Sequence, residues 1–332
     1  MGGVDITRLS PDDEAGCIEV VALLTAVAKV DSPEQILPTP KGVANGLRYG
    51  WDLNPSHEYL ARDADGTLIG MLNVHWPKWE NLNQGWFGVE VHPDHRRRGI
   101  GSELVQYFEK LAADAGKDTV GSGAHESVAC EAFAAKHGYE RKAIEVQRRQ
   151  DLTGLDWDVV QALYDKAAEA STGYELLRLN GALPEEMLED MVAVTESIND
   201  APTDDLDIED DVYSTQRLRD YEEAQRSSDM TTYRVVAREK ATGKLAGHTL
   251  IAVDGERPWI AWQHDTAVSR DHRGHRLGAL VKADLLLWLR ESAPEVKSID
   301  TWNAESNNHM IGINEQLNYR IIARDFDYQK KL

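Results

Sequence analysis

A block of residues in the first half of the chain recurs 177 positions later, and this repeat limits the folds open to the chain. The block holds a hairpin, the end of a strand and a basic, glycine-containing helix start. The matched pairs are Gly66/Gly243, Leu68/Leu245, Gly70/Gly247, Val91/Val268, Asp94/Asp271, His95/His272, Arg96/Arg273 and Gly101/Gly278. Chance identities do not keep one register through three elements, so the sequence predicts a tandem duplication. At 332 residues the chain is long enough for two ordinary domains.

Hydrophobic periodicity and turn signals predict the same order of elements in both halves: helices, a hairpin, a strand, a helix, a strand, a helix and a closing strand. In the first half we expect helices at 14–30, 34–49, 99–115 and 127–136, and strands at 56–62, 67–75, 85–92, 119–122 and 141–149. In the second half we expect helices at 184–199, 215–227, 277–291 and 307–317, and strands at 233–238, 245–253, 260–268, 298–302 and from 319 onward. The sequence predicts domains at 1–152 and 175–332, joined by a helical connector at 153–174.

Composition excludes several classes of function. A net charge of −21 argues against nucleic acid as a partner, because phosphate binding requires a surplus of Lys and Arg. No stretch approaches the roughly 20 apolar residues of a membrane span, and no secretion signal is visible. Cys17 and Cys130 stand far apart without metal-ligand spacing, so we expect a cytoplasmic protein without a metal site or a membrane partner.

A dense acidic run lies between the first two helices of the second half. It consists of Asp204, Asp205, Asp207, Glu209, Asp210 and Asp211. Such a run is either a solvated loop or a surface that attracts a cationic substrate. The sequence leaves both interpretations open.

The end of the repeated block predicts an anion-binding turn. In the first copy a strand ends at Val91, and the segment Arg96-Arg97-Arg98-Gly99-Ile100-Gly101-Ser102 leads into a helix. The first N–H groups of a helix lack internal partners, and together with the helix dipole they attract anions. Glycines allow a diphosphate to approach the backbone closely. No Gly-Lys-Ser/Thr follows, so the segment is not a Walker loop.

This Arg-x-x-Gly-x-Gly segment behind a Val-x-Pro strand end resembles motif A of the GNAT superfamily of acyl-CoA-dependent N-acetyltransferases. The order of elements resembles the same family, and Glu131–Tyr139 resembles its motif B helix, which ends in Gly-Phe or Gly-Tyr. The resemblance covers nearly the whole chain, twice. It implies an α/β (α+β) fold of two tandem GNAT-like domains, each with a mixed, mostly antiparallel central sheet flanked by helices.

The resemblance also implies how the donor binds. Backbone amides of residues 96–102 would hold the pyrophosphate of acetyl-CoA, the acyl donor. The strand that ends at Val91 would pair with the pantetheine arm and stabilise the oxyanion with an N–H group. A free amine attacks directly, so the site needs a base for the ammonium and an acid or solvent for the departing thiolate.

The sequence offers one candidate base in each copy and no tyrosine at the position of the usual acid. Glu90 precedes Val91 on the central strand and is the candidate base of the first copy, although a solvated or ion-paired glutamate fits as well. The family often places a tyrosine, as acid, four residues before the motif B glycine, but that position is Ala134 here. Asp265 is the candidate base of the second copy.

The second copy departs from the motif at one position, where Arg276 replaces the first glycine. Its expected donor-binding residues are Val268, Arg273, Gly274, His275, Arg276, Gly278 and Asn307, the last by resemblance to a family asparagine that contacts the cofactor arm. Asn314 takes the position of the usual tyrosine. The second copy is either a working site or a degenerate one that is kept for packing and for closing the acceptor site.

The sequence thus predicts an enzyme that moves an acetyl or short acyl group from acyl-CoA to a primary amine of a small, cationic molecule. The alternatives are a non-catalytic acyl-CoA-binding or regulatory protein, and acetylation of a protein amine. A monomer and a homodimer are both compatible with the sequence.

Overall fold

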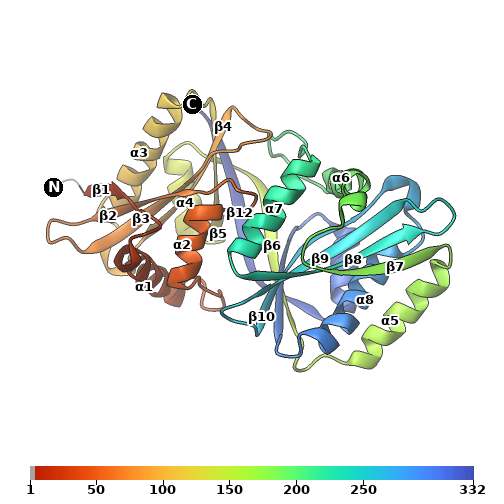
Figure 1. Cartoon of the computed structure of the whole chain (residues 1–332). Coiled ribbons are helices and arrows are strands. Elements are labelled where there is room, and N and C mark those ends of the chain that lie inside the picture. Colours follow the sequence, from red (N-terminus) through yellow and green to blue (C-terminus); the bar gives the residue numbers. More distant parts are fainter. Residues whose placement is uncertain (1–3) are drawn as a thin grey trace. The chain divides into compact units, whose positions relative to one another are not determined.

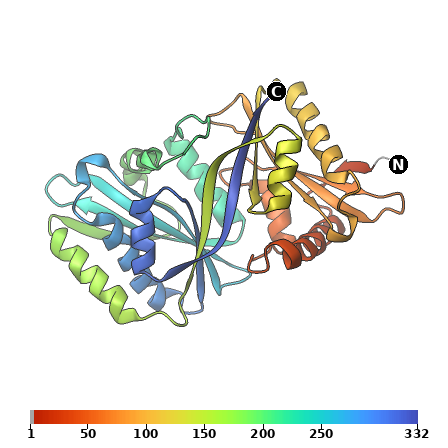
Figure 2. The ribbon, with the colours of Figure 1, turned by 180° about the vertical axis from the view of Figure 1, so that it is seen from behind.

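The computed structural model describes residues 4–332 and divides into two compact units. The first unit comprises residues up to 145, Thr203–Glu209 and Ala323–Leu332. The second comprises Val146–Pro202 and Asp210–Ile322. Figures 1 and 2 show the chain from opposite sides. Among the described residues, no helix combines the length and the apolar character that crossing a bilayer requires.

The first unit is built on a sheet whose strands follow the order β1-β2-β3-β4-β5-β12. Neighbouring strands in this sheet are antiparallel, except β4 and β5, which are parallel. The strands are β1 (Asp5–Arg8), β2 (His57–Arg62), β3 (Leu68–His75), β4 (Gln84–Val91), β5 (Thr119–His125) and β12 (Tyr319–Lys331). The helices are α1 (Glu14–Asp31), α2 (Pro40–Tyr49), α3 (Ile100–Asp114) and α4 (Val128–Lys136), with a short 3₁₀ helix, η1 (Pro93–His95).

Helices cover both faces of this sheet. On one face, Leu60 and Met71 pack with Val20 and Leu23 of α1. On the other, Leu72 and Val74 pack with Phe108 of α3. Figure 2 shows α4 beside β12, in agreement with the contact between Cys130 of α4 and Tyr328 of β12. Side chains that alternate along a strand therefore point either toward α1 and α2 or toward α3 and α4.

The second unit repeats the plan on a sheet of order β6-β11-β10-β9-β8-β7, in which β10 and β11 are parallel. The strands are β6 (Glu140–Asp151), β7 (Tyr174–Asn180), β8 (Met230–Glu239), β9 (Leu245–Asp254), β10 (Ile260–Val268) and β11 (Ser298–Ala304). The helices are α5 (Trp157–Ala170), α6 (Leu188–Glu196), α7 (Thr215–Ser227), α8 (Leu277–Ser292) and α9 (Asn308–Gln316), with 3₁₀ helices η2 (Glu185–Met187), η3 (Ser197–Asp200) and η4 (Arg270–His272).

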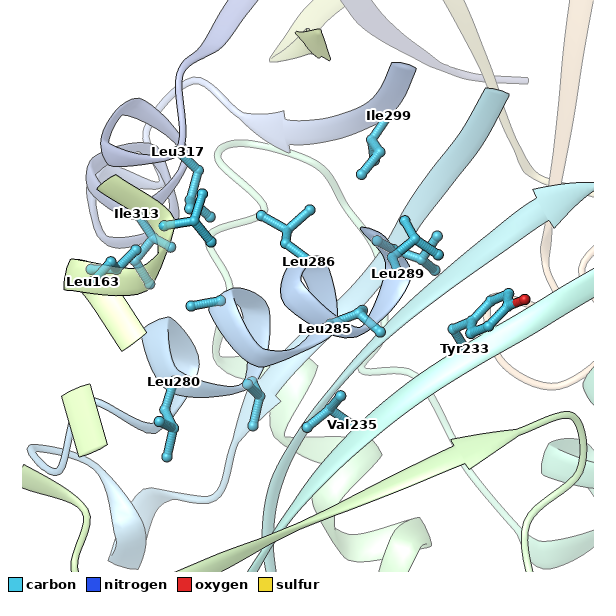
Figure 3. Packing of buried hydrophobic residues seen from close by; sticks show 14 of the residues in the cluster. Leu163, Tyr233, Val235, Leu280, Leu285, Leu286, Leu289, Ile299, Ile313 and Leu317 are labelled. Carbon is cyan, nitrogen blue, oxygen red and sulfur yellow. The ribbon is translucent and has the colours of Figure 1, made fainter. Parts of the chain in front are cut away.

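The core of the second unit surrounds α8. Figure 3 shows Leu285 and Leu289 of α8 directed toward Val235 and Tyr233 of β8. Leu163 of α5 and residues of α9 complete this cluster. Met191 of α6 and Leu218 of α7 pack with Val236 on the other face of the sheet. The two faces are thus occupied as in the first unit.

The predicted fold class is confirmed, whereas several predicted elements are wrong. Strands β1 and β7 precede the helices with which we expected each copy of the repeat to start; both are edge strands with half-exposed sequences that lack a clean alternation. The helix expected at 34–49 begins only at Pro40, because Thr39 caps it and proline favours the first helical turn. The helix expected at 184–199 divides into η2, α6 and η3. The strand expected at 119–122 continues to His125, because β12 pairs along its whole length.

Most of the acidic run belongs to the first unit, where hydrogen bonds tie it down. The Asp207 N–H donates to Gln329 and its carbonyl accepts from Gln84, over distances of 2.8 and 2.5 Å. The Asp207 carboxylate pairs with Lys331 at 2.6 Å, and Glu209 accepts from the backbone N–H of Asn81. These residues thus form an anchored strap, unlike a freely solvated loop.

Candidate functional site

The central parallel strands of the first unit diverge. Their registered pairs run from Gln84↔Thr119 to Phe87↔Ser122, although both strands continue beyond these residues. Over its last residues, β5 pairs with β12 on its outer edge. The carboxyl ends of β4 and β5 therefore leave a gap in the sheet.

The register of β4 identifies the backbone groups that face this gap. The His92 N–H donates to the Ile69 carbonyl of the neighbouring chain segment at 2.9 Å. Because backbone groups alternate along an antiparallel strand, Gly88 and Glu90 direct theirs toward β3, and Val89 and Val91 direct theirs toward β5. The amides of Val89 and Val91 thus lie where an extended ligand could add to the strand.

The turn after β4 leads to a helix start without a side-chain cap. Gly99 occupies the N-cap position of α3 in the left-handed conformation (φ 93°), and no side chain caps the helix. Six of the other described α-helices have such a cap, supplied by Asp13, Thr39, Ser127, Asp156, Ser214 and Asn307. The start of α3 thus has no side-chain acceptor for its first N–H groups, which is compatible with the predicted anion site.

Gly101 is required by the packing of the helix start. A Cβ atom at this position would lie 3.3 Å from Phe133 of α4 and 3.7 Å from Val91. The glycine thus lets α3 approach β4 and α4 closely, and Ile100, beside it, is buried in the core of the unit.

The three arginines of the turn have different environments. Arg96 donates from Nε to the Val91 carbonyl at 3.1 Å, and its Nη atoms bind the Asp31 carboxylate at the end of α1. Arg98 donates to the Asp94 carbonyl at 2.7 Å, and Arg97 is exposed with φ 63°. The side chain of Arg96 thus organises the turn, and the exposed Arg97 and Arg98 are better placed to meet a phosphate.

Two residues at the end of α4 add polar groups that sequence reasoning missed. Lys136 Nζ lies 3.0 Å and His137 Nε2 lies 2.9 Å from the Ser102 hydroxyl in the first turn of α3. Helix α4 thus brings a cation to the turn that the sequence predicts to bind an anion. A lysine and a histidine before Gly138 are too common at helix ends to reveal this role from sequence alone.

Glu90 lies on the face opposite α3 in an electrostatically unusual position. The pKa of its carboxyl is raised to about 7, mainly by burial; nearby Asp31 also raises the pKa, whereas His125 and Arg96 lower it. His125 of β5 forms an ion pair with Asp325 of β12 at 2.5 Å. That carboxylate raises the pKa of His125 and so favours the protonated imidazole, whose charge lowers the pKa of Glu90.

The position of the usual acid is closed. Ala134 is buried in the core between α3 and α4. The first unit therefore provides no acid at that position.

The second unit repeats the divergence and the turn. Pairs between β10 and β11 end at Trp262↔Asp300. Arg273 donates from Nε to the Val268 carbonyl at 3.1 Å, the same bond that Arg96 makes, and pairs with Asp200. These two arginines fold back onto their strands in the same way, so the two copies of the turn share one structure.

Arg276 keeps the backbone conformation of the glycine that it replaces. Its φ is 57°, its side chain is exposed, and no side chain caps α8. Gly274 also has a positive φ, and Gly278 is buried against Val268 and Ile313. The second turn is thus preserved and carries an additional surface cation.

The other candidate residues of the second unit form hydrogen bonds within the protein. The His275 carbonyl accepts from the Ser171 hydroxyl at 2.5 Å. The Asn307 side-chain oxygen caps α9 by accepting from Met310 at 3.2 Å. Asn314, at the position of the usual acid, is buried between Lys282 and Asn303 at 3.0 and 2.8 Å.

Asp265 lies in an irregular stretch of β10 between Gln263 and Thr266, where the pairing with β9 shifts register. The pKa of its carboxyl is raised to about 6, mainly by burial; Asp211 also raises the pKa, whereas Arg234 and Arg217 lower it. Beside it, His264 lies 2.6 Å from the Tyr221 hydroxyl of α7. Asp265 and Glu90 thus share a helix-covered face but are not equivalent in register. The residue of the second unit that is equivalent to Glu90 is Ala267, which pairs with His248 as Glu90 pairs with Met71.

Comparisons with known proteins agree with this geometry. The sequence profile of the acetyltransferase (GNAT) family matches residues 27–142 and 193–319, one match in each half. The chain belongs to this family.

Among curated relatives, a mycothiol acetyltransferase of Geodermatophilus obscurus is 32% identical over 158 residues, which are 46% of each chain. A mycothiol acetyltransferase of Stackebrandtia nassauensis is 30% identical over 149 residues, 44% of this chain and 46% of that protein. The chain thus spans about half the length of the curated relatives that it matches.

Solved structures extend the likeness of fold to the whole chain. A tandem GNAT protein from the clavulanic acid biosynthesis pathway has a TM-score of 0.82 at 24% identity, covering 99% of this chain and 98% of that one. A GCN5-related N-acetyltransferase from Sphaerobacter thermophilus has a TM-score of 0.72 at 16% identity, covering 99% and 95%. Both units therefore have the GNAT fold.

Proposed function

We propose that this protein is an N-acetyltransferase that moves an acetyl or short acyl group from acyl-CoA, with acetyl-CoA as the expected donor, to a primary amine of a small molecule. The observation that carries the proposal is the gap beside β4 of the first unit, which is continuous with the uncapped start of α3. A strand edge next to a helix N-terminus suits an extended amide-containing arm that ends in phosphates.

Residues of the first unit can divide the chemistry between them. The first amides of α3, with Arg97 and Arg98, would bind the pyrophosphate, and Lys136 would add charge beside them. The Val89 and Val91 amides, which face the gap, would hold the arm and stabilise negative charge on the acyl oxygen as the amine attacks. Acyl-CoA supplies the activated thioester.

Glu90 is the proposed base. Its side chain lies on the face of the sheet opposite α3, so the amine would approach from the α1 and α2 side. A carboxyl with a pKa near 7 is matched to accepting a proton from an ammonium at neutral pH, directly or through water.

The acceptor of the first unit is proposed to be cationic. Glu58, Glu90, Asp325 and Asp327 all lie on this face of the sheet, on β2, β4 and β12. The pKa of Asp327 is raised to about 6, mainly by burial and also by repulsion from the neighbouring Asp325. A bound ammonium would relieve it.

A second active centre in the second unit is supported by Arg276. It adopts the left-handed conformation of the glycine it replaces, so the turn keeps its shape, and α8 begins without a side-chain cap. We propose that Asp265 acts there as the base.

Titration calorimetry with acetyl-CoA tests donor binding in each unit. Gly101→Trp should abolish binding in the first unit, because a side chain there would meet Phe133 and Val91, and Gly278→Trp should abolish it in the second. Two sites in the wild type, one in each variant and none in the double variant are expected. The matched control is Gly46→Trp, since Gly46 is exposed on α2 and a Cβ there would meet no atom within 4 Å.

An unchanged stoichiometry in both variants would overturn the donor sites. Release of free CoA thiol in the presence of an amine panel tests the reaction itself. Binding without turnover for any amine would favour a non-catalytic acyl-CoA-binding protein.

A further inference from the structure

The two units hold opposite charges at one equivalent position in their sheets. Asn73 of β3 and Leu250 of β9 are 177 positions apart, like the repeated glycines. Glu58 of β2 stands opposite Asn73, and Arg234 of β8 stands opposite Leu250. The strand register thus makes Glu58 and Arg234 equivalent, although the repeat in the sequence does not align them.

Both side chains lie on the face that carries the candidate base. Leu60, two residues after Glu58, packs in the cluster that includes α1, so Glu58 faces α1 and α2. Val236, two residues after Arg234, packs with α6 and α7, so Arg234 faces those helices.

Glu58 is incompletely compensated within the first unit. Its Oε1 accepts from Asn73 Nδ2 at 2.5 Å, whereas its buried Oε2 has no hydrogen-bond partner among the described residues. Burial raises the pKa of this carboxyl to about 7. A cation beside Oε2 would restore the ionised form.

Arg234 is more deeply buried, with 5% of its surface exposed. Its Nε and Nη1 have no hydrogen-bond partner within the described part of the chain. The same holds for both ring nitrogens of His248, which is on the neighbouring strand of the same face. Glu222 and Asp265 act on the Arg234 guanidinium electrostatically, but neither is hydrogen-bonded to its Nε or Nη1. Because an unsatisfied buried donor costs free energy, an acceptor group that bears negative charge would suit this position.

The separation between Arg234 and Asp265 limits the size of the ligand. The irregular stretch of β10 that holds His264 and Asp265 lies opposite Leu250, which in turn stands opposite Arg234. Two strand spacings separate the Cα atoms by about 10 Å, and both side chains project over the same face. A short molecule that carries an amine and a carboxylate could reach Asp265 and Arg234 together.

We propose that this position reads the charge of the acceptor: Glu58 selects a second ammonium in the first unit, and Arg234 selects a carboxylate in the second. The first unit would thus take a diamine-like acceptor and the second an amino-carboxylate. The inference rests on the proposed function, because that function identifies the ligand as an amine acceptor. The charge of the ligand is inferred from the geometry.

Equilibrium dialysis without acyl donor tests the proposal on the full chain. The probes are radiolabelled 1,4-diaminobutane and 4-aminobutanoate, which differ only at one end, with 1-aminobutane as competitor. Arg234→Gln should weaken 4-aminobutanoate about tenfold or more and leave 1,4-diaminobutane unchanged, because a hydrogen bond to a charged group is lost. Glu58→Gln should do the reverse.

Two conservative controls match these substitutions. Arg238→Gln removes an arginine of the same strand that pairs with Glu175 at the surface, and Glu19→Gln removes the exposed partner of Arg62. Neither should change the affinity for a probe. Arg234→Lys, which retains the charge, should keep part of the preference for the carboxylate.

Melting temperature separates recognition from a structural role. Removing a buried guanidinium that has two unsatisfied nitrogens should leave the melting temperature of Arg234→Gln equal to or above that of the wild type. Equal loss of both probes, no loss of either, no binding to the wild type, or failure of Arg234→Gln and Arg234→Lys to fold would each overturn the proposal. Selective probe binding without acetyl-CoA binding would refute the proposed function and leave charge recognition intact.

Discussion

At the scale of single residues, the most informative groups are carboxyls that are buried beside a sheet. Glu58, Glu90, Asp265 and Asp327 all have a pKa raised by burial. Raised carboxyl pKa values cluster at functional sites, because a group that exchanges a proton near neutral pH can act as an acid or a base. Each of these groups predicts a measurable pH dependence.

Glu90→Gln should lower the rate of acetyl transfer by the first unit about 100-fold or more, because a general base is removed. The Gly278→Trp variant isolates the first unit. In this variant, with Glu90 intact, the rate of acetyl transfer should rise with pH through about 7 as Glu90 ionises. Initial rates between about pH 5.5 and 9 measure both effects. Acetyl-CoA affinity should be unchanged by Glu90→Gln, and a rate that stays high with the same pH profile would exclude Glu90 as the base.

Glu58→Gln should stabilise the protein increasingly as pH rises. The folded pKa of about 7 exceeds the unfolded value of 4.5, so the wild type loses stability between these values as the unfolded chain ionises first. The difference in unfolding free energy should be near zero below pH 4.5 and reach at most about 3 kcal/mol above pH 7. Urea denaturation at several pH values measures it; a difference independent of pH would mean that Glu58 is not held in its neutral form.

At the scale of elements, glycines determine how close the central strands lie to their neighbours. A Cβ at Gly121 of β5 would lie 2.6 Å from the indole of Trp86, whereas one at Gly88 of β4 would lie 3.9 Å from Asn73. Both positions belong to the face that carries Glu90.

Gly121→Ala should therefore destabilise the first unit by about 1–3 kcal/mol, because the methyl group overpacks against a fixed ring. Gly88→Ala is the matched control and should be neutral or slightly stabilising, since alanine restricts the unfolded chain more than glycine. Chemical denaturation followed by tryptophan fluorescence compares the two. Equal effects would show that Trp86 moves aside.

At the scale of the whole molecule, the first unit depends on residues encoded more than 170 positions after its main segment ends. Ala323–Leu332 supplies the strand that pairs with β5 from His125 to Thr119, and it carries Asp325 and Tyr328. Phe326 and Tyr328 of this segment are buried in the core that contains Phe108.

Truncation after Ile322 should thus unfold or loosen the first unit while the second keeps its core. Hydrogen exchange should show lost protection in β5 (Thr119–His125) and unchanged protection in α8. Removing Leu332 alone, which contributes one backbone bond to Asp118, is the control and should leave both units protected. Retained protection of β5 in the longer truncation would show that β12 is dispensable for the first unit.

The sequence by itself predicted the duplication and nearly all helices and strands, because local periodicity, glycines and caps encode them. The GNAT fold was predicted from the resemblance of the turn after Val91, and of the order of elements, to that family. The turn after Val91 and the helix start at Ile100 follow from adjacent residues, so a motif was sufficient to find them. The edge strands β1 and β7 were missed, since their half-exposed residues carry no alternating pattern.

Only the tertiary structure decided which distant side chains share a site. Arg96 turns toward Asp31, Lys136 joins Ser102, and Asp325 meets His125, and none of these pairs is close in sequence. The equivalence of Glu58 and Arg234 likewise depends on strand register, which follows from backbone pairing across the sheet. Local sequence determines helices and turns because their hydrogen bonds and caps are local. The charge of a site depends on residues from several strands, which only folding brings together.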